Sequence, residues 1–223
     1  MNFATYPDRE MMMLDLADQI ASELRAAIEA KGRATLSVPG GTTPGPIFDT
    51  LSGVDLDWSK VAVMLNDERW VDETSPRSNT RLLRERLQKD RAAKAVLVPL
   101  YADAPRPEDK MEVLAEGIAA HLPIDVLLLG MGADMHTASL FPGADRLAEA
   151  LSDDAPILLP MRAEAAGEPR ITLSAPVLRD AMHIHILITG AEKRAAIERA
   201  ETLPVEEAPV GAVLANATVH WAE

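Results

Sequence analysis

The side chains best suited to proton transfer follow the most strand-like stretch of the chain. Residues Ile124 to Leu129 form an apolar run that ends at Gly130, and Asp134 and His136 stand in the loop beyond it. Such a run is typical of a buried parallel strand, and ligands of open α/β sheets bind at the carboxyl ends of these strands. Histidine exchanges protons near neutral pH, so we predict an acid–base role for His136; the alternative is a structural histidine.

Other chemistries at this loop are less well supported by the sequence. The G-M-G at residues 130–132 matches the first half of a dinucleotide-binding fingerprint, but Met135 occupies the third glycine position. Asp134 and His136 are of metal-binding types, yet no third ligand stands at a sensible spacing. Ser139 lacks the glycine-flanked pattern of a nucleophile, and we assign it to packing or capping.

A second candidate loop, P-G-G-T-T-P at residues 39–44, also follows a predicted strand. Gly40 and Gly41 allow close backbone approach, and the exposed N–H groups at a helix start attract anions. Thr42 adds a hydroxyl donor. We expect a phosphate or sugar to bind here, the alternative being a plain turn with Thr43 as the helix cap. The absence of a Walker lysine argues against a nucleotide P-loop.

A third candidate loop, at residues 66–70, reads N-D-E-R-W directly after a buried strand. Polar groups at such a position are costly unless they have partners. We expect Asp67 to point inward as an orienting or acid–base group. The alternative is a cluster of surface salt bridges.

Two cations stand at the ends of predicted elements in the last third of the chain. Arg170 begins a strand, and Lys193 follows Thr189-Gly190 near the start of a helix. A cation at that end opposes the helix dipole, and a bound anion would relieve the conflict. The alternative for Lys193 is an ordinary exposed lysine.

The remaining histidines carry weaker expectations. His183 and His185 alternate on a predicted strand, so at least one should be a core residue with satisfied hydrogen bonds. His121 and His220 are expected at the surface or in packing.

Apolar runs and amphipathic helices alternate along the chain, which predicts a mostly parallel sheet with helices on both faces. We expect one domain over residues 1–223, because no linker is long enough to divide it. Strands are predicted at residues 34–38, 61–65, 95–100, 124–129, 157–160, 170–173, 183–189 and 218–221. Helices are predicted at residues 8–31, 46–51, 79–88, 107–121, 191–200 and 209–214.

Composition narrows the classes of function. The formal net charge of −13 argues against nucleic acid or an anionic membrane as partner, although it permits a small anionic ligand held by local arginines. The chain has no cysteine, which excludes disulfides and thiol catalysis. We see no signal peptide and no apolar run long enough to cross a bilayer, so we expect a cytoplasmic protein, monomeric or weakly homodimeric.

Together these loops resemble the family of 6-phosphogluconolactonases. The resemblance rests on P-G-G-T-T-P, N-D-E-R-W-V with S-N-T-R-L-L, L-L-G-M-G-A-D-M-H-T-A-S-L-F-P-G, and R-I-T-L-S-A-P-V-L with I-T-G-A-E-K. These pieces occur in the family's order and span almost the whole chain. The resemblance implies a Rossmann-like α/β fold similar to that of glucosamine-6-phosphate deaminase.

The resemblance also implies an activity: hydrolysis of 6-phospho-D-glucono-1,5-lactone in the oxidative pentose phosphate pathway, with no metal or cofactor. The family's histidine base corresponds to His136, and its D-E-R motif to Asp67 and Arg69. We expect His136 to activate water, Asp67 to orient His136 or substrate hydroxyls, and Arg69 or backbone N–H groups to stabilise the oxyanion.

By the same resemblance, the phosphate would meet the glycine-rich loop, Gly40, Gly41 and Thr42, and two cations, Arg170 and Lys193. Arg81 is a further candidate. The alternatives are a deaminase or aldose–ketose isomerase on the same fold, and a sugar-phosphate sensor without activity.

One residue departs from the family. Met135 stands where the family usually has glycine. If this position needs a positive φ, methionine costs about 1–3 kcal/mol of strain. If the glycine only provides room, Met135 narrows the pocket.

Overall fold

The computed structural model describes residues 1–223 and contains two sheets. All strands of the larger sheet are parallel, as expected for strands that alternate with helices. Its order is β1 (Asn2–Thr5), β10 (Ala217–Ala222), β9 (His183–Thr189), β6 (Val126–Gly130), β2 (Ala34–Val38), β3 (Val61–Leu65) and β5 (Val96–Val98). The predicted α/β class and mostly parallel sheet are confirmed.

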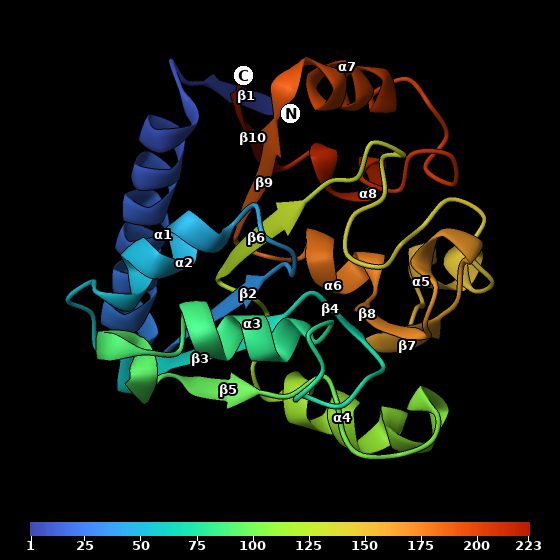
Figure 1. The fold of residues 1–223 in the computed structure, drawn as a ribbon, viewed down its shortest axis with the longest axis horizontal. Coiled ribbons are helices and arrows are strands. Elements are labelled where there is room, and N and C mark those ends of the chain that lie inside the picture. The colour runs from blue at the N-terminus through green and yellow to red at the C-terminus, as the bar shows by residue number, and fades with distance from the viewer.

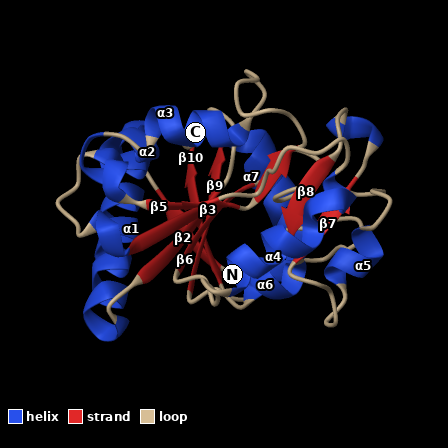
Figure 2. Ribbon diagram, turned by 90° about the horizontal axis from the view of Figure 1, so that it is seen from below, coloured by secondary structure: helices blue, strands red, loops and turns tan.

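Helices cover both faces of this sheet (Figures 1 and 2). The long α1 and the short α2 lie on one face, whereas α4 and α6 lie on the other with the smaller sheet (Figure 2). The helices are α1 (Arg9–Lys31), α2 (Gly45–Ser52), α3 (Asn79–Arg86), α4 (Met111–Ala119), α5 (Leu147–Leu151), α6 (Ala175–Arg179), α7 (Gly190–Ala200) and α8 (Gly211–Leu214). None of them is both long and apolar enough to span a bilayer.

Local sequence explains where α1 begins and ends. The Asp8 side chain accepts a hydrogen bond from the Met11 N–H, which caps the first turn. Gly32, at φ 78°, ends the helix in the left-handed conformation that glycine adopts without strain. Between these caps, Leu16 and Leu24 belong to the apolar stripe that is buried against the sheet.

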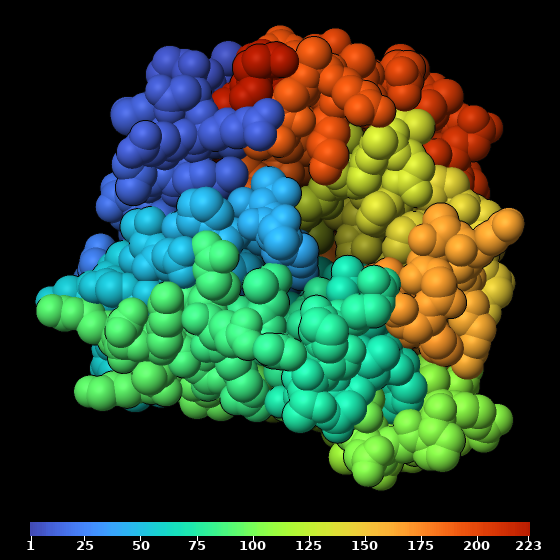
Figure 3. Space-filling view, in the orientation of Figure 1, coloured from blue at the N-terminus to red at the C-terminus, as the bar shows by residue number.

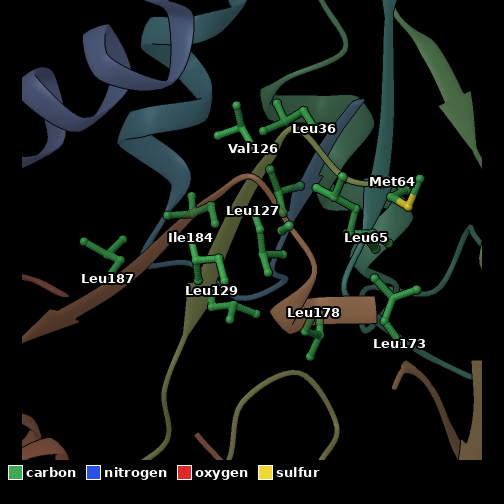
Figure 4. Packing of buried hydrophobic residues seen from close by; sticks show 14 of the residues in the cluster. Leu36, Met64, Leu65, Val126, Leu127, Leu129, Leu173, Leu178, Ile184 and Leu187 are labelled. Atoms are coloured by element: carbon green, nitrogen blue, oxygen red, sulfur yellow. The ribbon is translucent and has the colours of Figure 1, made fainter. Parts of the chain in front are cut away.

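A cluster of 59 buried hydrophobic residues fills the space between sheet and helices. Leu127 and Leu129 of β6 lie at its centre, beside Leu36 of β2 and Ile184 of β9 (Figure 4). Strands buried on both faces explain the continuous apolar runs in the sequence. The expectation of a single domain stays a prediction.

The smaller sheet is antiparallel, with the order β4 (Asp67–Arg69), β8 (Arg170–Leu173) and β7 (Leu158–Met161). Strands β7 and β8 confirm the strands predicted at residues 157–160 and 170–173. The prediction of a loop after β3 is wrong at residues 67–69, because these residues pair with Arg170–Thr172. This pairing places Arg69 opposite Arg170.

The order of the strands defines one switch point. From β2 the chain proceeds to β3 and β5 on one side, and β6 then enters between β2 and β9 to continue on the other side. The connections that leave β2 and β6 therefore diverge, and they open a crevice at the carboxyl ends of these two strands.

Candidate active site

A cleft of about 370 Å³ lies at this switch point. In Figure 3 the loop after β2 (light blue), the β4–α3 region (teal) and the loop after β6 (yellow-green) meet around the hollow. Seven of the predicted site residues line the cleft: Gly40, Gly41, Asp67, Arg69, His136, Arg170 and Lys193. The sequence identified them one loop at a time, and the parallel sheet brings them together.

His136 is paired with a carboxylate of its own loop. Its Nδ1 lies 2.5 Å from Oδ1 of Asp134, and the same oxygen accepts the His136 backbone N–H at 3.2 Å. An ionised carboxylate only accepts, so Nδ1 carries the proton and Nε2 keeps its lone pair. A Cβ at Gly132 would lie 2.2 Å from Nδ1 and 2.4 Å from Oδ1, so only glycine leaves room for this pair.

Met135 lies between the two partners with φ 65°, in the left-handed region that costs most side chains about 1–2 kcal/mol. Its N–H donates to the Gly132 carbonyl at 3.0 Å, and its carbonyl accepts from the Val210 N–H at 3.1 Å. The side chain packs on the hydrophobic core and does not line the cleft. The departure from the family therefore affects backbone strain and does not narrow the pocket.

Asp67 is held from the interior side. Its Oδ2 accepts the hydroxyl of the buried Ser139 at 2.5 Å and lies 3.7 Å from Nη1 of Arg170. Of the two roles expected for Asp67, the orientation of His136 belongs instead to Asp134. A role toward substrate hydroxyls stays open to Asp67.

Arg170 is a buried cation with unused hydrogen-bonding capacity. Its Nη2 donates to the Ala166 carbonyl at 3.1 Å, whereas its buried Nε has no partner. Burial lowers the pKa of Arg170 from its usual value, although the nearby Asp67 acts in the opposite direction. The Phe141 ring, whose centroid is 5.7 Å from Cζ of Arg170, also packs against the His136 ring in a tilted arrangement, with the two ring centroids 4.4 Å apart.

Lys193 and Arg69 add to the positive charge of the cleft. Lys193 is half-buried in the first turn of α7, as predicted, and makes no ion pair within the chain. Arg69 donates from Nη1 to the Arg77 carbonyl at 2.5 Å, and its buried Nε has no partner. Among the charged side chains that line the cleft, these two and Arg170 face a single carboxylate, that of Asp67. The cleft is therefore locally suited to an anion in a chain that is acidic as a whole.

Glu68 is a structural residue that the sequence analysis did not single out. This fully buried carboxylate accepts the backbone N–H groups of Arg69, Asn79 and Thr80 at 2.7–2.9 Å, and also the hydroxyls of Ser78 and Thr80. Burial raises its pKa, although these hydrogen bonds act in the opposite direction. Glu68 joins β4 to the start of α3, which contradicts the alternative of a surface salt bridge at this residue.

Asn79 connects this junction to the glycine-rich loop. Its Nδ2 donates to the Asp67 carbonyl at 3.1 Å. A Cβ at Gly40 would lie 2.1 Å from its Oδ1, so Gly40 is needed for the close approach. The alternative of Thr43 as a helix cap is wrong, because α2 has no side-chain cap and Thr43 lines the cleft.

Arg81 and Thr42 lie outside the cleft. Arg81, on the exposed face of α3, donates from Nε to Glu85 and from Nη1 to the Thr74 carbonyl. The ion pair with Glu85, four residues further along α3, accounts for the direction of the Arg81 side chain. Thr42 is exposed and lines a separate groove between α1 and α2. We therefore withdraw both residues from the predicted phosphate site.

The metal-binding alternative finds no support in the side-chain arrangement. No group of three or more His, Asp or Glu side chains is placed to hold a metal ion.

Comparisons with known proteins agree across the whole chain. Residues 7–221 match the family model described as glucosamine-6-phosphate isomerases/6-phosphogluconolactonase. The chain is 46% identical to a 6-phosphogluconolactonase of Rhizobium meliloti, over 93% of this chain and 92% of that protein. It is 42% identical to one of Mesorhizobium japonicum, over 99% and 95%. The crystal structure of a 6-phosphogluconolactonase from Shewanella baltica superposes with a TM-score of 0.96 at 35% identity, over 100% and 97% of the two chains.

Proposed function

The chain belongs to the glucosamine-6-phosphate isomerase/6-phosphogluconolactonase family, and from this premise we propose that it hydrolyses 6-phospho-D-glucono-1,5-lactone to 6-phosphogluconate. The names of relatives at 40–46% identity support the lactonase over the deaminase branch of the family. The observation that carries the proposal is the shared cleft, which is lined by His136 and by three cations, Arg69, Arg170 and Lys193. The enzyme acts in the oxidative pentose phosphate pathway.

His136 is the general base. With its proton held on Nδ1 by Asp134, the imidazole offers Nε2 to a water molecule. Nε2 takes a proton from the water as its oxygen attacks the lactone carbonyl carbon. The same nitrogen then returns the proton to the ring oxygen as the C–O bond breaks, so the base is regenerated. A lactone is already a reactive ester, and the gain from one positioned base is about 10²–10⁴-fold.

The cations divide between the two ends of the substrate. Arg170 and Lys193, with the N–H groups of the Gly40–Gly41 turn, hold the phosphate away from the reacting bond. Arg69 stabilises the oxyanion that forms on the carbonyl oxygen. The excess of positive over negative side chains along the cleft supports these roles, since an anion bound there is attracted to all three cations.

The experiment is lactone hydrolysis measured above the spontaneous background, with and without a chelator. His136→Ala should abolish most of the activity while 6-phosphogluconate still binds, whereas the exposed His183→Ala should behave as wild type. Near-normal turnover by His136→Ala would refute the assignment of the base. Ammonia release from glucosamine 6-phosphate would instead place the chain in the deaminase branch.

Two expectations from the sequence accompany this proposal: a cytoplasmic location, and a monomer or weak homodimer. A sedimentation experiment at several protein concentrations tests the second.

A further inference from the structure

Ser139 connects the loop that carries His136 to the smaller sheet. It is fully buried, and its hydroxyl donates to Asp67 Oδ2 at 2.5 Å. Its backbone N–H donates to Thr172 Oγ1 at 3.2 Å. Asp67 belongs to β4 and Thr172 to β8, so Ser139 reaches both strands from a loop on β6. The sequence assigned this residue only to packing or capping.

The two oxygens of Asp67 have different surroundings. Oδ2 accepts the Ser139 hydroxyl and lies near the Arg170 guanidinium, on the interior side. Oδ1 accepts no hydrogen bond from the protein, although Asp67 lines the cleft. Holding one oxygen of a carboxylate fixes the plane of the group, and so fixes the direction in which the other oxygen accepts.

The chemistry of a carboxylate limits what Oδ1 can bind. An ionised carboxylate accepts hydrogen bonds and repels other acceptors. The phosphate and the carbonyl oxygen of a sugar-phosphate lactone are acceptors, so neither fits this position. The ring hydroxyls are the donors that such a substrate offers.

We propose that Ser139 is a positioning residue for substrate binding: its hydroxyl holds Oδ2 of Asp67 so that Oδ1 accepts a hydrogen bond from a ring hydroxyl. This inference rests on the proposed lactonase function. Because the bound hydroxyl does not react, the contact stabilises the ground state and the transition state equally. Loss of the contact therefore raises KM and leaves kcat unchanged.

The test compares Ser139→Ala with Ser174→Ala, Asp67→Ala and the Ser139→Ala/Asp67→Ala double variant. Ser174 is a matched control, since it is equally buried and its hydroxyl has no hydrogen-bond partner. We expect Ser139→Ala to raise KM about 10- to 100-fold, as for one hydrogen bond to a charged group. Ser174→Ala should keep the wild-type KM. The double variant should match Asp67→Ala, because Ser139 acts through Asp67.

Three results would overturn the inference: a KM for Ser139→Ala equal to that of the control, a fall in kcat at unchanged KM, or effects of Ser139→Ala and Asp67→Ala that multiply. If Ser139→Ala does not fold, Ser139→Cys, with its weaker donor, decides by the same measurement. Each result is separable from a failure of the lactonase proposal, which wild-type turnover and His136→Ala test independently.

Discussion

Asp134 and His136 form a carboxylate–imidazole pair between residues only two positions apart, with Oδ1 2.5 Å from Nδ1. Two side chains this close in the sequence can meet because Met135 adopts a positive φ and Gly132 has no side chain. The pair is thus a product of the loop's backbone conformation. It sets the tautomer of the imidazole and leaves Nε2 for the substrate.

Asp134→Asn should lower kcat about 100-fold or more with little change in KM. An amide can donate to Nδ1 and so stabilise the tautomer with its proton on Nε2, where it blocks general-base catalysis. Steady-state kinetics at saturating lactone measure the effect. The exposed Asp154→Asn is the control for loss of one negative charge. Equal kcat values in the two variants would contradict an orienting role for Asp134.

Lys193→Ala should raise KM about 10- to 100-fold with a smaller effect on kcat, because a charged contact to the phosphate is lost far from the reacting bond. Arg81→Ala is the matched control: it also removes one positive charge, but from a side chain outside the cleft that is paired with Glu85. Initial rates over a range of lactone concentrations distinguish the two. If both variants shift KM alike, the effect is general electrostatics and Lys193 does not bind the phosphate.

The sequence predicted those parts of the site that sit directly after apolar strands. His136 and the Gly40–Gly41 turn follow strands whose apolar runs are continuous, and Lys193 follows β9. Parallel strands place all three at one edge of the sheet, so the predicted strand ends were enough to predict that these residues lie together. The predicted family resemblance is confirmed over residues 7–221.

The parts that failed depend on contacts distant in sequence or on side-chain direction. Strand β4 has three polar residues and no apolar alternation, and only its pairing with β8 makes it a strand. Arg81 lies outside the cleft because it stands on the face of α3 that is turned away from it, and a sequence motif does not indicate which face of a helix is turned toward a site. Ser139 and Asp67 are 72 positions apart, so no local sequence pattern predicts their hydrogen bond.

Met135→Gly should raise the free energy of unfolding by about 1 kcal/mol, because glycine adopts the observed φ of 65° without the strain that methionine carries. Ala133→Gly, in the same loop but at an ordinary φ, should lower it by about 0.5–1 kcal/mol through the added freedom of the unfolded chain. Urea unfolding of both variants gives the comparison. A loss of stability in both would mean that packing of the Met135 side chain outweighs the strain.

A chain of hydrogen bonds that runs from the surface into the core lies away from the cleft. Tyr6 donates to Asp15, so the Tyr6 oxygen accepts from His220 Nδ1 at 2.9 Å. His220 Nε2 must then accept from His185 Nδ1, 3.0 Å away, and His185 Nε2 lies 2.8 Å from Glu23. His185 confirms the expectation of a core histidine, and His220 is buried as well.

These contacts require a neutral His220, because a proton on its Nε2 would face the His185 N–H. Burial, and then the charge of His185, lower the pKa of His220 from 6.5 to about 4. Between about pH 4 and pH 6.5, His220 is therefore protonated in the unfolded chain and neutral in the folded chain. The contribution of His220 to the free energy of unfolding is fully present above pH 6.5 and is lost as the pH falls toward about 4.

The expected loss from this histidine is about 2 kcal/mol between pH 7.5 and pH 5. His220→Asn removes the titrating group, so its free energy of unfolding should change about 2 kcal/mol less over that range than the wild-type value. Urea denaturation of the two proteins at both pH values measures this difference. Parallel curves for wild type and His220→Asn would show that His220 titrates alike in the folded and unfolded chains, and would contradict the hydrogen-bond directions assigned to this network.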